Sequence, residues 1–249
     1  MKNNIVIFRA KGPTNNSYFI ESLKELNYNI MSYPILKVEK ISNNKFAFKS
    51  DSIILTTSFY SIYYLSRLTF ERNFVLYTLG EASKNLARKL GFKNIIECNG
   101  DSARMFKVFI NNNKSSSYKK KGALIYLGAN NISFNLPAKL ADLGYVVQRY
   151  KVYKTINVKK LSNKFINLVQ KKSIAWVVLL SKKGARNFYS LSNKVFSEEE
   201  ISELKFACLS KNIADVLIKK NYNKVFCNFP NVNQIKKLIL NNESEYGAL

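Results

Sequence analysis

Histidine is absent from this 249-residue sequence. Without an imidazole, the chain cannot build a Ser-His-Asp triad, a Cys-His pair, a histidine metal site or a histidine general base. Any reaction that the chain catalyses must therefore depend on hydroxyl groups, carboxylates, lysines, backbone amides or the positioning of the substrate.

Cysteine and long apolar runs are also scarce. Cys98, Cys208 and Cys227 are odd in number and widely separated, which gives neither a disulfide framework nor a zinc site. No apolar run approaches the roughly 20 residues of a membrane-spanning helix. The longest apolar runs are similar in length to residues 175–180. The apolar stretch in the opening MKNNIVIF is too short for a secretory signal, so we expect a cytoplasmic protein without a membrane partner.

Acidic residues are few compared with basic ones. The chain has 16 Asp and Glu against 40 Lys and Arg, a formal net charge of +24. One interpretation is a polyanionic partner, either a nucleic acid or a polycarboxylate. The other is a compositional bias, because Lys, Asn, Ile and Tyr are all abundant and the lysines are spread along the whole chain. The charge permits an anionic ligand without identifying one.

Short apolar runs alternate with amphipathic stretches along the chain. This alternation is typical of an α/β fold with parallel sheets, in which apolar residues three or four apart mark the helices. The predicted strands are residues 4–8, 29–32, 52–55, 74–77, 94–96, 123–126, 146–148, 175–180, 205–208 and 224–227.

The chain also contains an internal repeat. The segment LGEASKNLARKLGFKNII aligns without a gap with LSKNIADVLIKKNYNKVF in the second half. Gly91 and Asn221 fall at equivalent points, where each suits the left-handed conformation that ends a helix. Asp101 and Asn231 also align, and each suits a helix N-cap. A looser match relates residues 5–36 to 123–153, so the sequence predicts two similar α/β units.

Several short motifs, in their order along the chain, resemble those of the uroporphyrinogen-III synthase family. They are Phe8-Arg9-Ala10, Thr56-Thr57-Ser58, Leu79-Gly80-Glu81-Ala82-Ser83, Val152-Tyr153-Lys154-Thr155, Leu179-Leu180-Ser181 and Leu209-Ser210-Lys211-Asn212-Ile213-Ala214. The resemblance covers nearly the whole chain, and its specificity comes from the order of the motifs and the duplication. The sequence departs from the family at Leu127, Leu180 and Ile213, to which we assign no role in ligand binding.

The resemblance implies two similar parallel-sheet α/β domains, one of them discontinuous, joined by a two-stranded connection. The expected domains are residues 1–36 with 154–249, and the inserted residues 42–150. The expected connecting strands are residues 37–41 and 148–155.

The resemblance also implies a reaction. The family cyclises hydroxymethylbilane, a linear tetrapyrrole with an acetate and a propionate on each ring, to uroporphyrinogen III. The terminal ring is inverted and water is lost, so the enzyme would be a cyclising carbon–oxygen lyase of porphyrin and haem biosynthesis. We expect a monomer that needs no metal or organic cofactor and binds no nucleic acid. Free hydroxymethylbilane closes without inversion, so the enzyme must chiefly position its substrate.

The expected site residues lie in turns after strands, where helix N-termini favour carboxylates. The expected substrate-binding residues are Arg9, Thr57, Ser58, Gly80, Glu81, Ala82, Ser83, Ser181, Lys182, Ser210, Lys211 and Asn212. Tyr153 is the expected catalytic residue, its hydroxyl assisting departure of the substrate hydroxyl or fixing the terminal ring. Each has a second interpretation: an ordinary N-cap for the serines and threonines, a surface arginine for Arg9, and a packed hinge tyrosine for Tyr153.

Other functions stay open at this point. The charge and the 15 tyrosines would suit a nucleic-acid-binding protein, although no binding motif is present. Two α/β lobes would also suit a ligand-binding protein without catalysis. A dinucleotide enzyme is disfavoured, because no GxGxxG follows a predicted strand.

Overall fold

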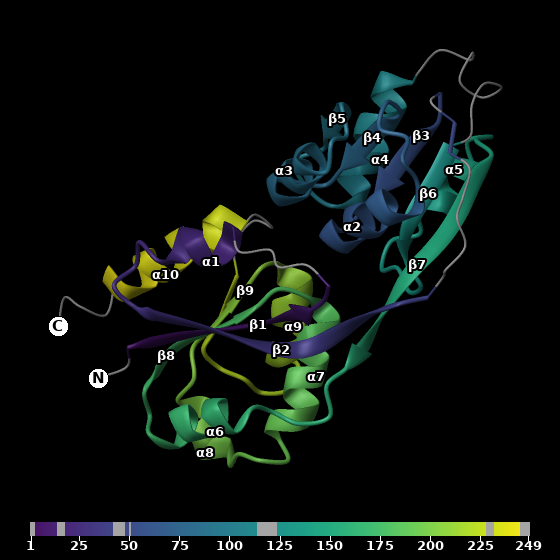
Figure 1. The fold of residues 1–249 in the computed structure, drawn as a ribbon. Helices are drawn as coiled ribbons and strands as arrows, with labels where there is room; N and C mark the ends of the chain where they lie inside the picture. Colours follow the sequence, from purple (N-terminus) through teal and green to yellow (C-terminus); the bar gives the residue numbers. More distant parts are fainter. Residues whose placement is uncertain are drawn as a thin grey trace. The chain divides into compact units, whose positions relative to one another are not determined.

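The computed structural model describes residues 3–13, 18–41, 48–49, 51–113, 124–227 and 232–244 (Figure 1). Within these ranges the chain contains the ten strands that the sequence predicts, and it divides into two compact units. The first unit is Met1–Lys37 with Ile156–Leu249, and the second is Val38–Thr155. Both have parallel sheets with helices on their faces, which confirms the predicted α/β fold class. Among the described helices, none combines the length and apolar character needed to cross a bilayer.

The sheet of the first unit has the strand order β10-β9-β8-β1-β2, with all neighbours parallel. Helices α1 and α10 cover one face, and α6, α7, α8 and α9 cover the other (Figure 1). The elements are β1 (Asn4–Lys11), α1 (Tyr18–Leu23), β2 (Asn29–Lys40), α6 (Asn163–Gln170), β8 (Ile174–Leu179), α7 (Lys182–Ser192), α8 (Glu198–Ser202), β9 (Phe206–Cys208), α9 (Lys211–Ile218), β10 (Val225–Cys227) and α10 (Val232–Ser244).

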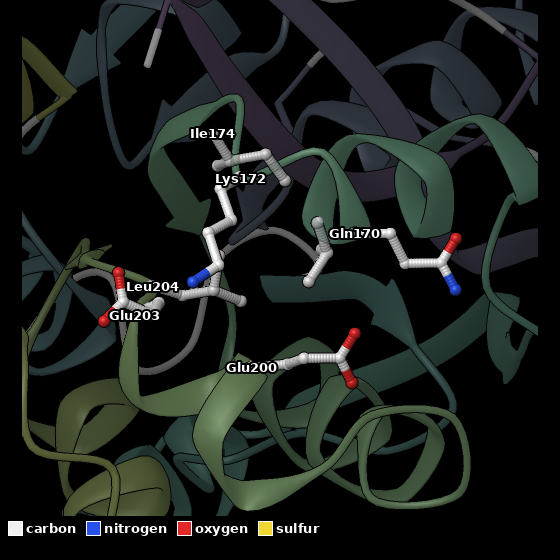
Figure 2. A pocket seen from close by; sticks show the side chains of 7 residues that line it. Gln170, Lys172, Ile174, Glu200, Glu203 and Leu204 are labelled. Atoms are coloured by element: carbon white, nitrogen blue, oxygen red, sulfur yellow. The ribbon is translucent and has the colours of Figure 1, made fainter. Parts of the chain in front are cut away.

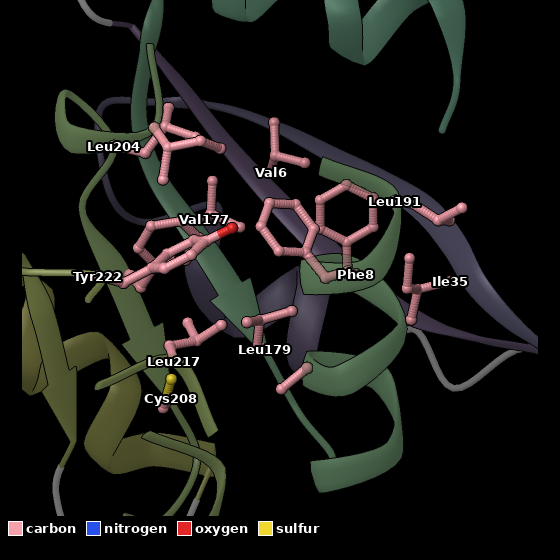
Figure 3. Close-up of a cluster of buried hydrophobic side chains, with 14 of the residues drawn as sticks. Val6, Phe8, Ile35, Val177, Leu179, Leu191, Leu204, Cys208, Leu217 and Tyr222 are labelled. Carbon is pink, nitrogen blue, oxygen red and sulfur yellow. The ribbon is translucent and has the colours of Figure 1, made fainter. Parts of the chain in front are cut away.

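Strand β1 contributes to the core on both faces of this sheet. Successive side chains of a strand point to opposite faces, so Val6 and Phe8 contact the helices α6 to α9 while Ile5 and Ile7 contact α1 and α10. All four are at most 1% exposed. Figure 3 shows Val6 and Phe8 among the side chains of β8 and α9. Burial of each such side chain contributes about 1.5–3 kcal/mol, which explains the continuous apolar run of this strand.

The sheet of the second unit has the strand order β7-β6-β3-β4-β5, again with parallel neighbours. Helices α2 and α3 pack on one face, and α4 and α5 pack on the other. The elements are β3 (Ile53–Thr56), α2 (Phe59–Leu68), β4 (Val75–Thr78), α3 (Glu81–Lys89), β5 (Asn94–Glu97), α4 (Ser102–Asn112), β6 (Leu124–Ala129), α5 (Leu136–Ala141) and β7 (Val147–Asn157).

The repeat that the sequence predicts has equivalent backbone geometry in the two units. Gly91 follows α3 with φ +87° and Asn221 follows α9 with φ +62°, both in the left-handed region that ends helices. Asp101 is the N-cap of α4, where its carboxylate accepts a hydrogen bond from the Arg104 N–H at 2.9 Å. Its expected counterpart, Asn231, lies outside the described residues.

Strands β2 and β7 extend beyond the predicted strands 29–32 and 146–148 into the expected connecting segments 37–41 and 148–155, because each continues from one unit into the other. Within the second unit, the Ile41 N–H donates to the Val152 carbonyl at 3.1 Å. Within the first unit, the Val158 N–H donates to the Ile35 carbonyl at 3.3 Å. Asn187 of α7 is 4% exposed there, and its amide donates to the carbonyls of both Ile35 and Val158, at 2.8 and 3.1 Å.

This buried amide leads to a stability prediction. Asn187→Ala removes both hydrogen bonds, one buried and one partly buried, so the free energy of unfolding should fall by about 1–3 kcal/mol. Urea unfolding followed by circular dichroism measures the change. Asn167→Ala, on the exposed side of α6, is the matched control and should change stability by less than about 0.5 kcal/mol. Equal effects of the two substitutions would contradict the structural role of Asn187.

Candidate functional site

Four turns that carry predicted site residues follow strands at the carboxyl ends of the two sheets. In the second unit, β3 and β4 are paired in parallel and lead through turns into α2 and α3. In the first unit, β8 and β9 are paired in the same way and lead into α7 and α9. Because the strands of each pair are neighbours, each unit presents two helix N-termini side by side.

One turn of each pair has its helix capped by a serine hydroxyl. Ser58 caps α2 with φ −156° and ψ 142°, and its Oγ accepts from the Tyr60 N–H at 3.1 Å. Ser181 caps α7 with φ −154° and ψ 147°, and its Oγ accepts from the Gly184 N–H at 3.0 Å. Both serines are therefore helix N-caps, as their second interpretation states. A hydroxyl that accepts in this way can still donate its own proton, and Ser181 can donate to a ligand.

The other turn of each pair lacks a side-chain cap. Gly80 precedes α3 with φ −160° and ψ 175°, and Ser210 precedes α9 with φ −157° and ψ 161°. Neither N-cap side chain bonds to a backbone N–H of the first turn. A helix N-terminus carries a partial positive charge and N–H groups that have no partner within the helix. Such a terminus can bind a carboxylate from a ligand.

The predicted binding residues gather in two groups, one in each unit. Thr57 and Ser58 belong to the turn beside that of Gly80, Glu81 and Ala82. Glu81 is exposed at the start of α3, where its carboxylate would repel an anion, so only its backbone N–H suits the predicted role. Ser83 is 9% exposed and faces inward from α3, which leaves its hydroxyl poorly placed for a ligand.

The group in the first unit consists of Ser181 and Lys182 beside Ser210, Lys211 and Asn212. Lys182, Lys211 and Asn212 are exposed, and they form the first residues of α7 and α9.

Arg9 lies at the same edge of the sheet in the first unit. It is half-buried near the end of β1, next to a register shift between Arg9 and Ala10. Strand β1 pairs with β8, with Phe8 opposite Leu179, so Arg9 is level with the turn that contains Ser181.

Tyr153 lies in β7 of the second unit and is 5% exposed. Its ring stacks on Tyr64 at a centroid distance of 6.0 Å, and the edge of Tyr60 contacts it at the same distance. Burial raises the pKa of the Tyr153 hydroxyl to about 12, while the hydroxyls of Ser58 and Ser61 oppose this shift. The phenol is therefore neutral at pH 7 and can donate a hydrogen bond.

The sequence analysis did not identify a second tyrosine, Tyr126, that lies beside Thr57. The Tyr126 hydroxyl lies 2.8 Å from Thr57 Oγ1. Burial raises the pKa of Tyr126, which is 1% exposed. Gly128 makes room for the ring, because a Cβ at that position would lie 2.9 Å from Tyr126 Cε1. Tyr126 lies close to Thr57 because β3 pairs in parallel with β6, and the sequence does not specify this pairing.

The three positions that depart from the family pattern carry apolar side chains packed in the cores. Leu127 and Ile213 are 0% and 5% exposed, and Leu180 packs against the core under α1 and α10. Packing in the cores accounts for their apolar character.

The described part of the chain holds no cluster of three His, Cys, Asp or Glu side chains suited to a metal ion. Cys98, Cys208 and Cys227 are free thiols. A small hollow of about 160 Å³ lies in the first unit away from the turns (Figure 2). Glu200 and Glu203 on its wall would disfavour an anionic ligand, and Glu200 already accepts from the Ser197 N–H at 2.9 Å.

Paired helix N-termini at the carboxyl ends of parallel strands define an α/β protein of two similar units. The family model for uroporphyrinogen-III synthase HemD matches residues 17–234. The chain therefore belongs to the uroporphyrinogen-III synthase family.

Solved structures show the same fold. The uroporphyrinogen-III synthetase of Helicobacter pylori 26695 has 15% identity and a TM-score of 0.62, with 96% of this chain and 99% of that chain covered. A mutant uroporphyrinogen III synthase from the extremely thermophilic bacterium Thermus thermophilus has 11% identity and a TM-score of 0.51, with coverage of 98% and 99%. No curated protein sequence matches the chain.

The open space beside Gly80 leads to a second prediction. No atom lies within 4 Å of a Cβ built at Gly80, and its φ of −160° suits any residue. Gly80→Asp should therefore cap α3 and stabilise the protein by roughly 0.3–1 kcal/mol through the hydrogen bond and the helix dipole. Thermal unfolding measures this gain.

Gly184→Ala is the contrasting substitution. A Cβ at Gly184 would lie 2.8 Å from Ser181 Oγ and 3.2 Å from Ile35 Cγ2, so this variant should lose about 1–3 kcal/mol. Destabilisation by Gly80→Asp would contradict the open geometry at the start of α3.

Proposed function

We propose that the protein cyclises hydroxymethylbilane to uroporphyrinogen III, inverting the terminal pyrrole ring with loss of water. The observation that carries this proposal is the pair of neighbouring helix N-termini in each unit, one capped by serine and one uncapped. Membership of the uroporphyrinogen-III synthase family supports it. The reaction would class the protein as a carbon–oxygen lyase of porphyrin and haem biosynthesis.

The substrate suits these turns because every pyrrole carries two carboxylates. At the uncapped turns of Gly80 and Ser210, a carboxylate can take the N–H groups that lack a side-chain partner. At the capped turns, Ser58 and Ser181 accept from the backbone. Ser181 can donate its own hydroxyl proton to a carboxylate, whereas the Ser58 hydroxyl also bonds to Tyr153. Arg9 can add a bidentate contact at the edge of the first sheet.

Positioning accounts for most of the expected catalysis. The unassisted substrate closes to the isomer without inversion, so the enzyme must favour one trajectory over an easy competing one. Fixed contacts to several carboxylates hold the terminal ring in a chosen orientation and reduce the entropy cost of the productive geometry.

Tyr153 is the residue to which we assign a chemical role. Its neutral phenol can donate a hydrogen bond to the hydroxyl group that leaves the substrate as water. A pKa of about 12 makes it a weak proton donor, which suits a supporting hydrogen bond better than full proton transfer. The Ser58 hydroxyl beside it links this group to the N-terminus of α2.

We further propose a cytoplasmic monomer that binds no nucleic acid and uses no cofactor. The basic residues are spread over both halves of the chain, which favours a small anionic substrate over a nucleic acid.

An isomer assay tests the proposed function. Purified protein incubated with fresh hydroxymethylbilane, without added metal or cofactor, should yield mainly the type III isomer, separated by chromatography after oxidation. The Gly80→Asp variant should be folded and stable, but its turnover should be clearly slower. Its new carboxylate occupies the position proposed for a carboxylate of the substrate. Production of only the non-inverted isomer at the spontaneous rate by folded protein would refute the proposal.

Tyr153→Phe tests the chemical role. A hydrogen bond made mainly in the transition state should lower kcat by about 10-fold or more, with little change in KM. Ser58→Ala and Ser210→Ala should have modest effects, about 0.5–1.5 kcal/mol each, because several turns share the carboxylates.

The melting temperature of Tyr153→Phe is the control for packing, since the ring is kept and only the hydroxyl is removed. Wild-type turnover in this variant would reduce Tyr153 to a packed core residue.

A further inference from the structure

A groove of about 410 Å³ runs between helices α7 and α9 of the first unit. The two helices follow the neighbouring parallel strands β8 and β9 and pack side by side. The groove is lined by Lys182, Arg186, Tyr189, Asn212, Asp215, Val216, Lys219 and Lys220. It is larger than the hollow beside Glu200, and most of its lining residues have no role in the turns.

The groove has a strongly positive but mixed lining. Lys182, Arg186, Lys219 and Lys220 supply cations, and Asp215 supplies a single carboxylate. Across the part of the chain that the structure describes, Lys182, Arg186 and Lys219 have no carboxylate within ion-pair distance. The Lys220 Nζ lies 5.1 Å from the centre of the Tyr189 ring. These cations are therefore available to an anionic ligand.

The groove begins at the turns of the candidate site. Lys182 is the first residue of α7, directly after Ser181, and Asn212 lies in the first turn of α9. From Lys182 to Tyr189 the groove follows α7 for about 10 Å, at about 1.5 Å per residue. This length matches one substituted pyrrole rather than a whole tetrapyrrole or a nucleic-acid strand.

We propose that this groove is a subsite for one pyrrole ring of the substrate, with Arg186 and Lys219 holding its acetate and propionate. The guanidinium fork of Arg186 suits a bidentate bond to one carboxylate, and the Lys219 ammonium suits the other. Tyr189 and Val216 offer a ring and an apolar surface to the pyrrole face. This inference rests on the proposed function and extends the binding site beyond the turns.

The Asp215 carboxylate favours a pyrrole as the ligand of the groove over a simple anion. A carboxylate among the cations weakens the binding of phosphate or a nucleic-acid backbone, whose charge is dense and which offers no N–H donor. A pyrrole carries a ring N–H as well as its two carboxylate arms, and Asp215 can accept that hydrogen bond. The combination of two free cations, one acceptor and a flat apolar surface therefore matches a carboxylated pyrrole.

The test compares KM and kcat for hydroxymethylbilane in charge-removing variants. Arg186→Gln with Lys219→Gln should raise KM about tenfold and leave kcat within about twofold, because the subsite binds substrate and transition state alike. Lys164→Gln with Lys171→Gln removes the same charge from exposed positions at α6 and should leave both constants unchanged. An equal rise of KM in this control would overturn the proposal in favour of a general charge effect.

The Asp215→Asn variant distinguishes the two interpretations of the groove by the direction in which KM changes. If Asp215 accepts from the pyrrole N–H, this variant should raise KM about threefold. If the groove is only a positive patch, removal of the carboxylate should lower KM, and that result would overturn the proposal. Unchanged melting temperatures confirm that the variants are folded.

A binding measurement separates this inference from the function itself. If the wild-type protein forms no type III isomer, the proposed function fails, and uroporphyrin, a fluorescent octacarboxylate, is titrated instead. Weaker uroporphyrin binding by at least about fivefold in Arg186→Gln with Lys219→Gln, but not in the α6 control, supports the groove as a site for carboxylated pyrroles. Equal affinity in all three proteins, or displacement of uroporphyrin by equimolar pyrophosphate, overturns it.

Discussion

Parallel pairing of neighbouring strands is the constraint from which the candidate site follows. Hydrogen bonds between β3 and β4, and between β8 and β9, bring the carboxyl ends of each pair to one edge of a sheet. Each strand then continues through a short turn into a helix that packs on the sheet. Two helix N-termini must therefore lie side by side in each unit. The partial positive charge of these helix N-termini follows from the backbone alone, before any side chain is considered.

The side chains refine this arrangement in a regular way. In each unit, the serine hydroxyl caps the helix after one strand, and the helix after its neighbour has no side-chain cap. The serine satisfies one N–H of the capped helix, whereas no side chain does so at the uncapped helix. The near-identical φ values of Ser58 and Ser181, and of Gly80 and Ser210, show that the duplication preserves local geometry where the residue type has changed.

A histidine-free protein must obtain its chemistry from other groups, and we propose hydroxyls of the second unit for this purpose. Tyr126 of β6, Tyr153 of β7, and Thr57 and Ser58 after β3 bring several hydroxyls together. A phenol is neutral at pH 7, and burial raises the pKa of both tyrosines further. This suits a reaction limited by substrate orientation, in which a developing negative charge on a leaving oxygen needs only a fixed donor.

The sequence alone determined the positions of the ten strands, the two-fold repeat and most of the turns. Local physics sets these features: apolar runs mark strands, Gly91 and Asn221 permit the left-handed conformation, and Asp101 caps its helix through a neighbour only three residues away.

Tertiary structure decided what depends on contacts between distant residues. Thr57 meets Tyr126 only because β3 pairs with β6, and the groove exists only because α7 and α9 pack on neighbouring strands. The same is true of Asn187, whose amide joins segments of β2 and the end of β7 that are far apart in the chain. A single sequence records the propensity of each segment, but strand order and side-chain burial are fixed only when the segments compete for the same core.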